Sequence, residues 1–335
     1  MTEKNAISRS ATEPTDRVTA SPATASVIAR MKMRHLDMLK NIERYGSLTR
    51  VAQETGISQP AVTKTLAEIE SLFGAPLFTR SGRGLIPTDM GKLAMLKSGR
   101  MLRELHHWAS EMEAVRKGHS ARLLIGAVPY VSGSLLTQAI TRLYERHNII
   151  IAVQQATTDH LLQSLCDHEL DCVLGRASAM AGRENLWHEV LYVQRPVLIG
   201  HNHLLERLGE RPLDWRTLAT MKWILPSLAT PVGAKMAELF TQEQVPVPLP
   251  IIETYSIDIM HGVLSTNESV VSVVPEDIAL DMVRRGGVGI LPWKMDWELP
   301  PLSLIRRVRD MPVDAEDKFA EILKELCNQA YFATK

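Results

Sequence analysis

The chain has 335 residues, of which 45% are hydrophobic and 23% are charged. This length allows at least two domains with their own cores, and the composition is too hydrophobic for a mainly disordered protein. No apolar run reaches the roughly 18 residues of a membrane helix, and the N-terminus lacks the hydrophobic core of a secretion signal. The three cysteines form no disulfide framework. We therefore expect a cytoplasmic, multidomain protein with no membrane segment.

Positive and negative side chains balance overall but are distributed unevenly. Lys+Arg and Asp+Glu both total 38. Residues 30–120 hold 15 basic and 9 acidic side chains, whereas residues 121–335 hold 20 basic and 26 acidic ones. A compact basic block before a larger acidic one indicates that the first part meets a polyanion and that the second has another role.

The N-terminal third predicts a tail followed by short helices. Residues 1–30 are rich in Ser, Thr, Ala and Pro without apolar periodicity, which predicts a flexible tail. Helical spacing then predicts three helices, over residues 33–45, 48–55 and 58–73, that each end at a glycine. Ser47 and Ser58 are predicted to cap the second and third helices, and Pro60 is tolerated in a first turn.

Two short strands and a long helix follow. Residues 76–80 and 85–87 flank a glycine-containing turn and predict a hairpin, or wing. Thr88 is predicted to cap a helix that continues to about Lys117.

The long helix carries an apolar stripe with 4-3-4-3 spacing, which is typical of a coiled-coil dimer. The stripe consists of Met101, Leu105, Trp108, Met112 and Val115. Projected backwards, it reaches the small residues Ser98, Ala94 and Gly91. The alternative is that this face packs on its own chain.

Beyond Gly118, β-rich apolar runs alternate with helical segments, which predicts α/β sheets buried between helices. The expected strands are residues 123–128, 149–154, 170–174, 190–193, 196–199, 223–225, 251–255, 270–274, 289–291 and 302–308, with a last helix from Asp314. About 215 residues are enough for two such sheets.

The strongest local motif runs from Ser47 to Glu70 and predicts a helix-turn-helix. Ser58, Gln59, Thr63 and Lys64 gather near the start of its second helix, the end that enters the major groove in this motif. Gln can bond adenine, Thr can contact thymine, and Lys can bond guanine or phosphate. In the adjacent wing, Arg80 and Arg83 are expected to contact phosphates or a narrow minor groove. The alternative is that these residues form only a solvated charged face.

Residues 46–91, GSLTRVAQETGISQPAVTKTLAEIESLFGAPLFTRSGRGLIPTDMG, resemble the DNA-binding half of LysR-type transcriptional regulators. The S-Q-P-A-V segment, the L-F-x-R wing and the T-x-x-G helix start occur in the family's order and spacing. The segments HELDCVLGR (168–176) and SVVSVVPEDIA (269–279) also resemble family segments. The tail before residue 30 is a departure from the family.

The resemblance implies a winged helix-turn-helix over 31–87, a dimerising linker helix over 88–117 and a periplasmic-binding-protein-like effector domain over 121–335. Its two subdomains would comprise about 121–194 with 292–335, and about 195–291. Carried over to this chain, Ser58, Gln59, Pro60, Thr63 and Lys64 would face the major groove of an operator, and Arg80 its flank. Lys64 stands where Arg is commoner. The implied partners are double-stranded DNA, a small-molecule effector, further copies of the chain in a homodimer or homotetramer, and RNA polymerase if the protein is an activator.

Strand ends in the α/β half predict the effector site. Backbone N–H groups and small hydroxyls gather where a predicted strand passes into a helix, which favours anions. By resemblance, these segments line the effector pocket; Arg176 would face it too, which suggests an acidic effector. The segment 223–233 resembles regulators of sugar uptake and aromatic-acid breakdown, so a carboxylate or sugar acid is expected. The predicted effector residues are Val128, Tyr130, Ser132, Ser134, Arg176, Ser227, Thr230 and Ser256. Simple helix capping is the alternative role for each Ser and Thr.

The remaining constellations predict neither a cofactor nor a metal. Cys166 and Cys172 are expected to be buried structural thiols. His201-x-His203 could hold a metal with a third ligand, but we expect no nearby carboxylate or cysteine to complete the set and predict a surface turn. An enzyme that uses the α/β half catalytically is the alternative function, but the sequence contains no nucleophile–base motif to support it.

Overall fold

The computed structural model describes residues 27, 29–81, 84–177, 183–208, 214–228, 230–309 and 313–333. Of the predicted tail, only residues 27, 29 and 30 are described, and these three are helical. The chain divides into two compact units, Met1–Leu102 and Arg103–Lys335. The predicted linker segment, residues 88–117, is therefore shared between the two units.

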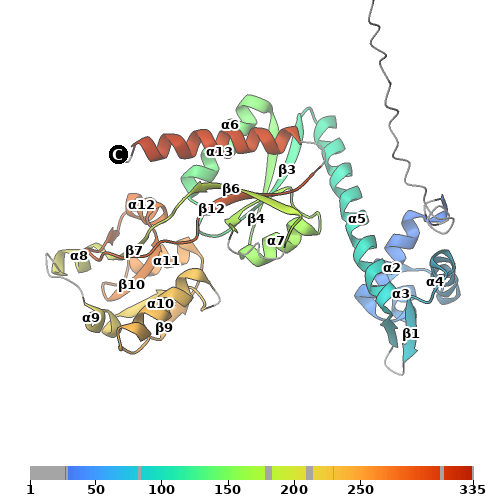
Figure 1. Cartoon of the computed structure of the whole chain (residues 1–335), viewed down its shortest axis with the longest axis horizontal. Coiled ribbons are helices and arrows are strands. Elements are labelled where there is room, and N and C mark those ends of the chain that lie inside the picture. The colour runs from blue at the N-terminus through green and yellow to red at the C-terminus, as the bar shows by residue number, and fades with distance from the viewer. Residues whose placement is uncertain are drawn as a thin grey trace, which may run out of the picture. The chain divides into compact units, whose positions relative to one another are not determined.

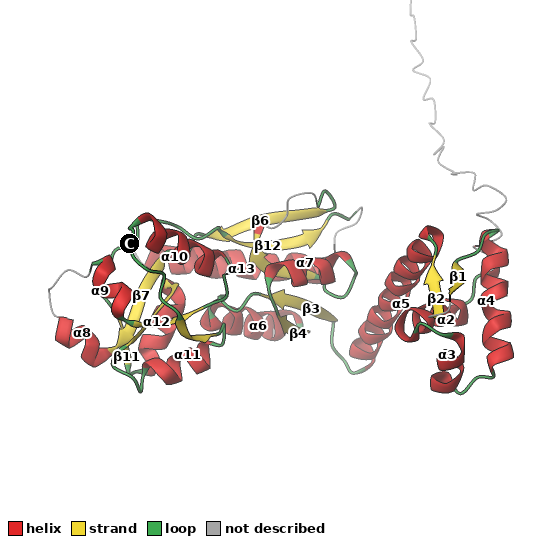
Figure 2. Cartoon of the chain, turned by 90° about the horizontal axis from the view of Figure 1, so that it is seen from below, coloured by secondary structure: helices red, strands yellow, loops and turns green. Residues whose placement is uncertain are grey.

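The first unit is a small helical domain with a hairpin (Figure 2). Each of its three short helices ends at a glycine in the left-handed region, where a side chain would be strained: Gly46, Gly56 and Gly74, with φ values of 68°, 70° and 69°. Its elements are α2 (Met33–Tyr45), α3 (Leu48–Thr55), α4 (Gln59–Phe73), β1 (Phe78–Ser81) and β2 (Gly84–Pro87). The predicted helices and wing are confirmed.

The long helix α5 (Asp89–Arg116) begins directly after the hairpin and has 28 residues. Its first turns contribute Ala94 and Met95 to the core of the helical domain, together with Leu39, Val51 and Val62. The predicted length of this helix is confirmed to within a residue at each end.

The second unit contains two five-stranded mixed sheets (Figures 1 and 2). The first sheet has the order β4 (Ile149–Gln155), β3 (Ala121–Ala127), β5 (Cys172–Arg176), β12 (Leu302–Arg307) and β6 (Leu186–Tyr192). Strands β4, β3 and β5 are parallel, and β12 runs antiparallel to both of its neighbours, β5 and β6. The second sheet has the order β11 (Val288–Ile290), β7 (Pro196–His201), β10 (Val270–Pro275), β8 (Lys222–Leu225) and β9 (Pro250–Glu253). Strands β10, β8 and β9 are parallel, whereas β7 runs antiparallel to both of its neighbours.

Helices cover both sheets. Helices α6 and α13 lie side by side against the first sheet (Figure 1). The helices of this unit are α6 (Gly133–His147), α7 (Thr158–Cys166), α8 (Asn202–Leu208), α9 (Trp215–Thr220), α10 (Pro231–Gln242), α11 (Ile257–Leu264), α12 (Glu276–Arg285) and α13 (Asp314–Ala333). Every predicted strand is present, with ends shifted by up to four residues, so the two-sheet α/β prediction is confirmed.

The chain crosses between the two sheets twice. Residues 193–195 lead from β6 to β7, and residues 291–301 return from β11 to β12. Each sheet has its own apolar core, the first around Leu174, Leu304 and Phe319 and the second around Trp223 and Phe240. The two subdomains therefore have separate cores and are connected by two crossings.

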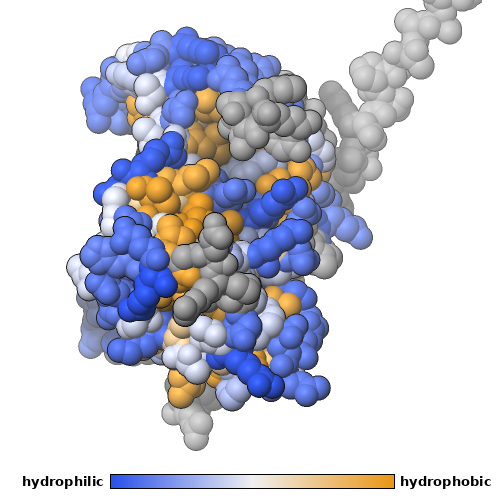
Figure 3. Space-filling model, turned by 90° about the vertical axis from the view of Figure 1, so that its left-hand side faces the viewer, coloured by the Kyte–Doolittle hydropathy of each residue, from blue (hydrophilic) through white to orange (hydrophobic). Residues whose placement is uncertain are grey.

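The surface at the end that carries the second sheet is mainly hydrophilic, with an apolar strip between the polar side chains (Figure 3). No helix among the described residues has both the length and the apolar character needed to span a membrane.

Candidate nucleic-acid interface and effector region

Helix α4 has one buried face and one exposed leading end. Val62 and Ile69 are fully buried and Leu66 is 7% exposed, because they pack against α2 and α3. At the start of the helix, Ser58, Gln59, Pro60 and Lys64 are exposed, and Thr63 is half-buried. The structure thus brings together the five residues predicted to contact bases, on a helix whose other face is anchored.

Ser47 and Ser58 occupy the N-cap positions of α3 and α4 as predicted, but the predicted hydroxyl hydrogen bonds are absent. The carbonyl groups of Ser47 and Ser58 accept helix bonds from Val51 and Val62, at N–O distances of 2.9 and 3.1 Å. Neither hydroxyl, however, accepts a cap bond from its helix. The Ser58 side chain is consequently not committed to its own helix, which suits a contact with a ligand.

The hairpin is held to α4 by a carboxylate that sequence reasoning missed. Glu70 Oε1 accepts the backbone N–H groups of Leu77 at 2.7 Å and Phe78 at 3.2 Å, directly before and at the start of β1. Arg80 lies in β1 opposite Leu85. Its side chain and the whole of Arg83 lie outside the described residues, so their predicted DNA contacts stay predictions.

A glycine allows the hairpin segment to approach the long helix closely. Thr88 caps α5 as predicted, because its Oγ1 accepts the N–H of Gly91 at 3.1 Å. A Cβ at Gly91 would lie 2.0 Å from the carbonyl oxygen of Leu77. The T-x-x-G motif therefore combines a cap with a close backbone approach.

The apolar stripe of α5 is exposed rather than packed on its own chain. Met101 and Trp108 are 59% exposed, Met112 57% and Val115 53%, whereas Leu105 is half-buried. The backward projection of the stripe is wrong, since Gly91, Ala94 and Ser98 are buried. The exposed apolar residues of the first turns are instead Met90, Leu93 and Leu96. Side-chain spacing alone did not show which small residues the helical core covers.

In the effector half, three of the predicted hydroxyls cap helices. Ser132 caps α6, Thr230 caps α10 and Ser256 caps α11 by accepting backbone N–H groups at 3.4, 3.1 and 3.3 Å. Helices α10 and α11 follow the neighbouring parallel strands β8 and β9, so their N-termini lie at the same sheet edge. Ser227 accepts the Thr230 hydroxyl with its carbonyl, and Ser134 is exposed and bonded to Gln138.

The segment after β3 joins the two subdomains. Val128 is 6% exposed and belongs to the first core, whereas the Tyr130 side chain is 8% exposed and belongs to the second. Ser132 Oγ reaches the α12 carboxylate of Asp281 at 3.1 Å. The Tyr130 hydroxyl is buried without a hydrogen-bond partner, and burial together with nearby Tyr255 raises its pKa. Because buried polar groups are nearly always hydrogen-bonded, this unpaired hydroxyl is exceptional.

Arg176 occupies a buried network at the crossings instead of an open position. It is 7% exposed, and its guanidinium donates to the carbonyl of Pro300 and to Oε1 of Gln194, one residue on each crossing segment. Gln194 Nε2 in turn donates to the Tyr130 carbonyl at 3.0 Å and to the Asp277 carboxylate at 2.8 and 2.9 Å.

The network continues on α12. The Tyr192 hydroxyl donates to Asp277 Oδ2 at 2.8 Å. Burial raises the pKa of Asp277 and lowers that of Arg176, since desolvation disfavours both charged forms. Sequence reasoning missed Gln194 and Asp277, because neither lies in a recognisable motif.

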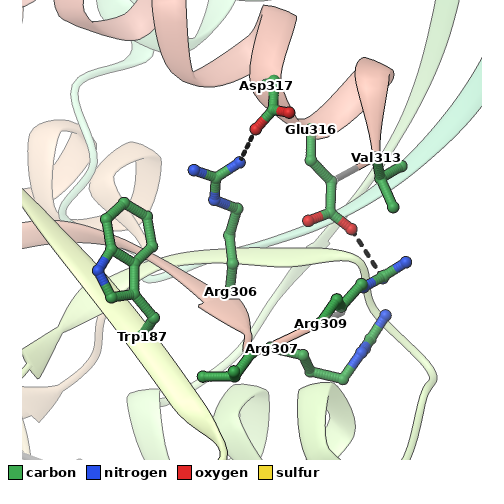
Figure 4. Close-up of a pocket in the computed structure, with 8 residues that line it drawn as sticks. Trp187, Arg306, Arg307, Arg309, Val313, Glu316 and Asp317 are labelled. Carbon is green, nitrogen blue, oxygen red and sulfur yellow. Dashed lines mark hydrogen bonds and ion pairs between the residues drawn. The ribbon is translucent and has the colours of Figure 1, made fainter. Parts of the chain in front are cut away.

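Two cavities lie away from the predicted effector residues. One, of about 340 Å³, is bordered by Trp187, three arginines and two carboxylates (Figure 4). Its cations are already paired: Arg306 with Asp317 at 2.6 Å, Arg309 with Glu316 at 2.7 Å and Arg307 with Asp171 at 3.8 Å. Burial raises the pKa of Glu316 to about 6. The other cavity, of about 220 Å³, lies between α5 and the start of β5 and includes His107 and Asp171.

The cysteines agree with their predicted roles only in part, and the histidine pair has a neighbour that was not predicted. All three cysteines are free; Cys172 is fully buried, as predicted, whereas Cys166 is only partly buried. The prediction that no carboxylate completes the His201-x-His203 pair is wrong. Glu268 lies beside these histidines although it is 65 residues from His203 in sequence.

Comparison with known proteins agrees with this geometry. Residues 33–92 match the family model of bacterial regulatory helix-turn-helix proteins of the lysR family, and residues 116–328 match the LysR substrate binding domain. The HTH-type transcriptional regulator GbpR of Azospirillum brasilense is 30% identical over 299 residues, covering 87% of this chain and 85% of that protein. PcaQ of Agrobacterium fabrum, another HTH-type transcriptional regulator, is 29% identical over 296 residues, covering 84% and 91%.

Among solved structures, full-length CbnR in complex with its target DNA has the same fold. The TM-score is 0.61 at 16% identity, over 88% of this chain and 99% of that one. The matches to regulators span both the helical domain and the two-sheet half, and they do not support the enzyme alternative. The chain therefore belongs to the LysR family of DNA-binding transcriptional regulators.

Proposed function

We propose that this protein reads an operator with the leading end of α4 and that a small anionic effector bound between its two subdomains changes this binding. The observation that carries the proposal is the exposure of Gln59 and Lys64 at the start of a helix whose opposite face is anchored by Val62 and Ile69. Ser58, Pro60 and Thr63 complete the base-facing surface. Arg80 and Arg83 of the wing are proposed to contact the neighbouring backbone.

The exposed stripe of α5 supports assembly through this helix. Four large apolar side chains that are each more than half exposed would be buried in an antiparallel or parallel helix pair. A dimer or a tetramer of such dimers would present several α4 helices to one operator. If the protein activates transcription, RNA polymerase is the additional partner.

The effector region suits a small molecule with a carboxylate, such as a sugar acid. The N-termini of α10 and α11 supply backbone donors at one sheet edge, and the unpaired Tyr130 hydroxyl offers a further polar contact. Arg176 is proposed to act by holding both crossings rather than by binding the carboxylate. A ligand can shift the arrangement of the subdomains only if it binds one arrangement more tightly.

Binding to promoter fragments tests the DNA part of the proposal. Fluorescence anisotropy of a labelled duplex should show an affinity that falls steeply with salt, because phosphate contacts release counterions. Lys64→Ala should reduce the affinity, whereas Lys222→Ala, at the exposed first position of β8, should not. A salt-independent affinity, or equal affinities for both variants, would contradict it.

A thermal-shift screen of carboxylates and sugar acids tests the effector part. A true effector raises the unfolding temperature by mass action. Tyr130→Phe keeps the buried ring but removes the hydroxyl, so it should weaken binding of that compound while leaving the ligand-free unfolding temperature nearly unchanged. If a compound binds the parent and Tyr130→Phe equally well, the Tyr130 hydroxyl is not part of the effector site. A screen in which only neutral compounds bind would refute the anionic assignment.

A further inference from the structure

Two histidines and a glutamate from separate segments meet on the surface of the second subdomain. His201 ends β7, His203 lies at the start of α8, and Glu268 lies in the connection between α11 and β10. One ligand atom from each of the three side chains lies within 4.8 Å of the other two. We propose that these three side chains bind a divalent transition-metal ion, with Zn²⁺ as the best match. This inference concerns a site outside the DNA-binding and effector regions.

The local contacts place the three groups together before any metal binds. Nδ1 of His203 is 3.0 Å from Oε1 of Glu268, and the two imidazole rings meet edge to face with centroids 4.9 Å apart. Arg207 donates to the Glu268 backbone carbonyl at 3.5 Å, and its charge also acts on the Glu268 carboxylate. The three side chains are thus already close together, and small side-chain rotations would bring their ligand atoms to metal-binding distances.

The ligand chemistry favours zinc over magnesium or calcium. Two imidazoles and one carboxylate are a common set for Zn²⁺, whereas Mg²⁺ and Ca²⁺ prefer oxygen ligands alone. Bond lengths of about 2.0–2.2 Å put the ligand atoms of a tetrahedral zinc site roughly 3.4 Å apart. The side chains of His203 and Glu268 are 63% and 53% exposed, so they can move by the distance of up to about 1.4 Å that separates the 4.8 Å spread from this geometry.

Binding has a definite local cost at His201. Its Nδ1 accepts the backbone N–H of His203 at 3.1 Å. Metal binding through either ring nitrogen breaks this hydrogen bond. A metal on Nδ1 uses the lone pair that accepts the N–H, and a metal on Nε2 requires the ring proton to be on Nδ1, which then cannot accept. Three protein ligands also leave a position for water or for another ligand.

A bound ion would cross-link two parts of the second subdomain. The segment that joins β7 to α8 would be tied to the connection that precedes β10, where Glu268 is located. Because an ion that binds only the folded protein stabilises it, the metal should raise the unfolding temperature of the subdomain.

The untagged, metal-free full chain provides the test. Calorimetry with Zn²⁺ should show one ion bound per chain, and Co²⁺ should give the intense visible absorption of a four- or five-coordinate site. His203→Asn and Glu268→Gln should each weaken Zn²⁺ binding at least tenfold and abolish the zinc-dependent rise in unfolding temperature, since loss of even outer-shell partners typically costs 10–100-fold. His188→Asn, at an exposed histidine on β6, is the matched control and should bind like the parent.

Two results would overturn the proposal. One is Zn²⁺ affinity that is the same in the parent, His203→Asn and Glu268→Gln, because the ion would then bind elsewhere. The other is a parent chain that binds no Zn²⁺ below millimolar concentrations or holds Co²⁺ only in an octahedral, weakly absorbing form. The unfolding temperature of each variant without metal shows that it folds, and a second ligand variant, His201→Asn, can replace one that does not.

Discussion

Replacing Arg176 by methionine tests whether the buried network holds the two subdomains together. The change keeps a long apolar side chain but removes both guanidinium hydrogen bonds, to Gln194 and to Pro300. It leaves two acceptors unpaired in a region where Arg176 is only 7% exposed. It also removes the positive charge near the buried Asp277 carboxylate.

The expected loss of stability is large for a single substitution. A hydrogen bond to a charged group contributes about 1.5–3 kcal/mol, so two of them, partly offset by relaxation, predict a loss of about 3–5 kcal/mol. The control is Arg195→Met, at the next position after Gln194. That side chain is 74% exposed and lies 3.9 Å from Glu298, so its replacement should change stability by less than about 0.5 kcal/mol.

Urea unfolding followed by tryptophan fluorescence measures this difference directly. Five of the six tryptophans lie in the two-sheet half and Trp108 lies on the exposed stripe of α5, so none of them lies in the core of the helical domain. Arg176→Met should unfold at clearly lower urea than the parent, and Arg195→Met at the same concentration. If both variants unfold like the parent, the buried network does not stabilise the crossings and the reasoning fails.

Three further substitutions test other parts of the structure. Gly91→Ala places a Cβ 2.0 Å from a backbone oxygen and should destabilise the helical domain by about 2–3 kcal/mol, as measured by circular-dichroism melts. Gly262→Ala, with open space around the new Cβ, is the control and should melt like the parent. Equal melting of the two variants would contradict the close approach at Gly91. The hydrogen bond to Asp171 raises the pKa of His107 above 6.5. The stabilisation of the fold by protonated His107 is therefore complete below pH 6.5 and is lost as the pH rises through the higher folded-state pKa. His107→Gln should remove this decline in stability, and an unchanged pH profile of the variant would refute the assignment. Trp108→Glu should give monomers in sedimentation, and His106→Glu, at an exposed position outside the stripe, should not; an intact oligomer in both would remove the stripe from the interface.

The local elements could be predicted from the sequence because short-range chemistry sets them. Glycines with φ near 70° end three helices, and Thr88 with Gly91 starts the long one. Alternating apolar runs likewise identified the strands of both sheets. Ser47 and Ser58 stand at the predicted N-cap positions, but the predicted hydroxyl bonds failed because the sequence indicates the position of a cap and not the direction in which its side chain points.

The contacts between distant segments could not be predicted in the same way. Arg176 looked like an anion-binding residue because its partners, Gln194 and Pro300, come from crossing segments that carry no motif. Glu268 reaches the histidine pair only through the folding of the second sheet. Tyr130 enters the core of the other subdomain, which periodicity within its own segment does not reveal.

Selection from a random pool of DNA duplexes shows whether the start of α4 reads bases. The parent protein should enrich a defined motif. Gln59→Ala should retain affinity for nonspecific duplex but lose about 1–3 kcal/mol of discrimination at one base-pair position of that motif. An unchanged motif in Gln59→Ala, or no motif for the parent, would contradict the account.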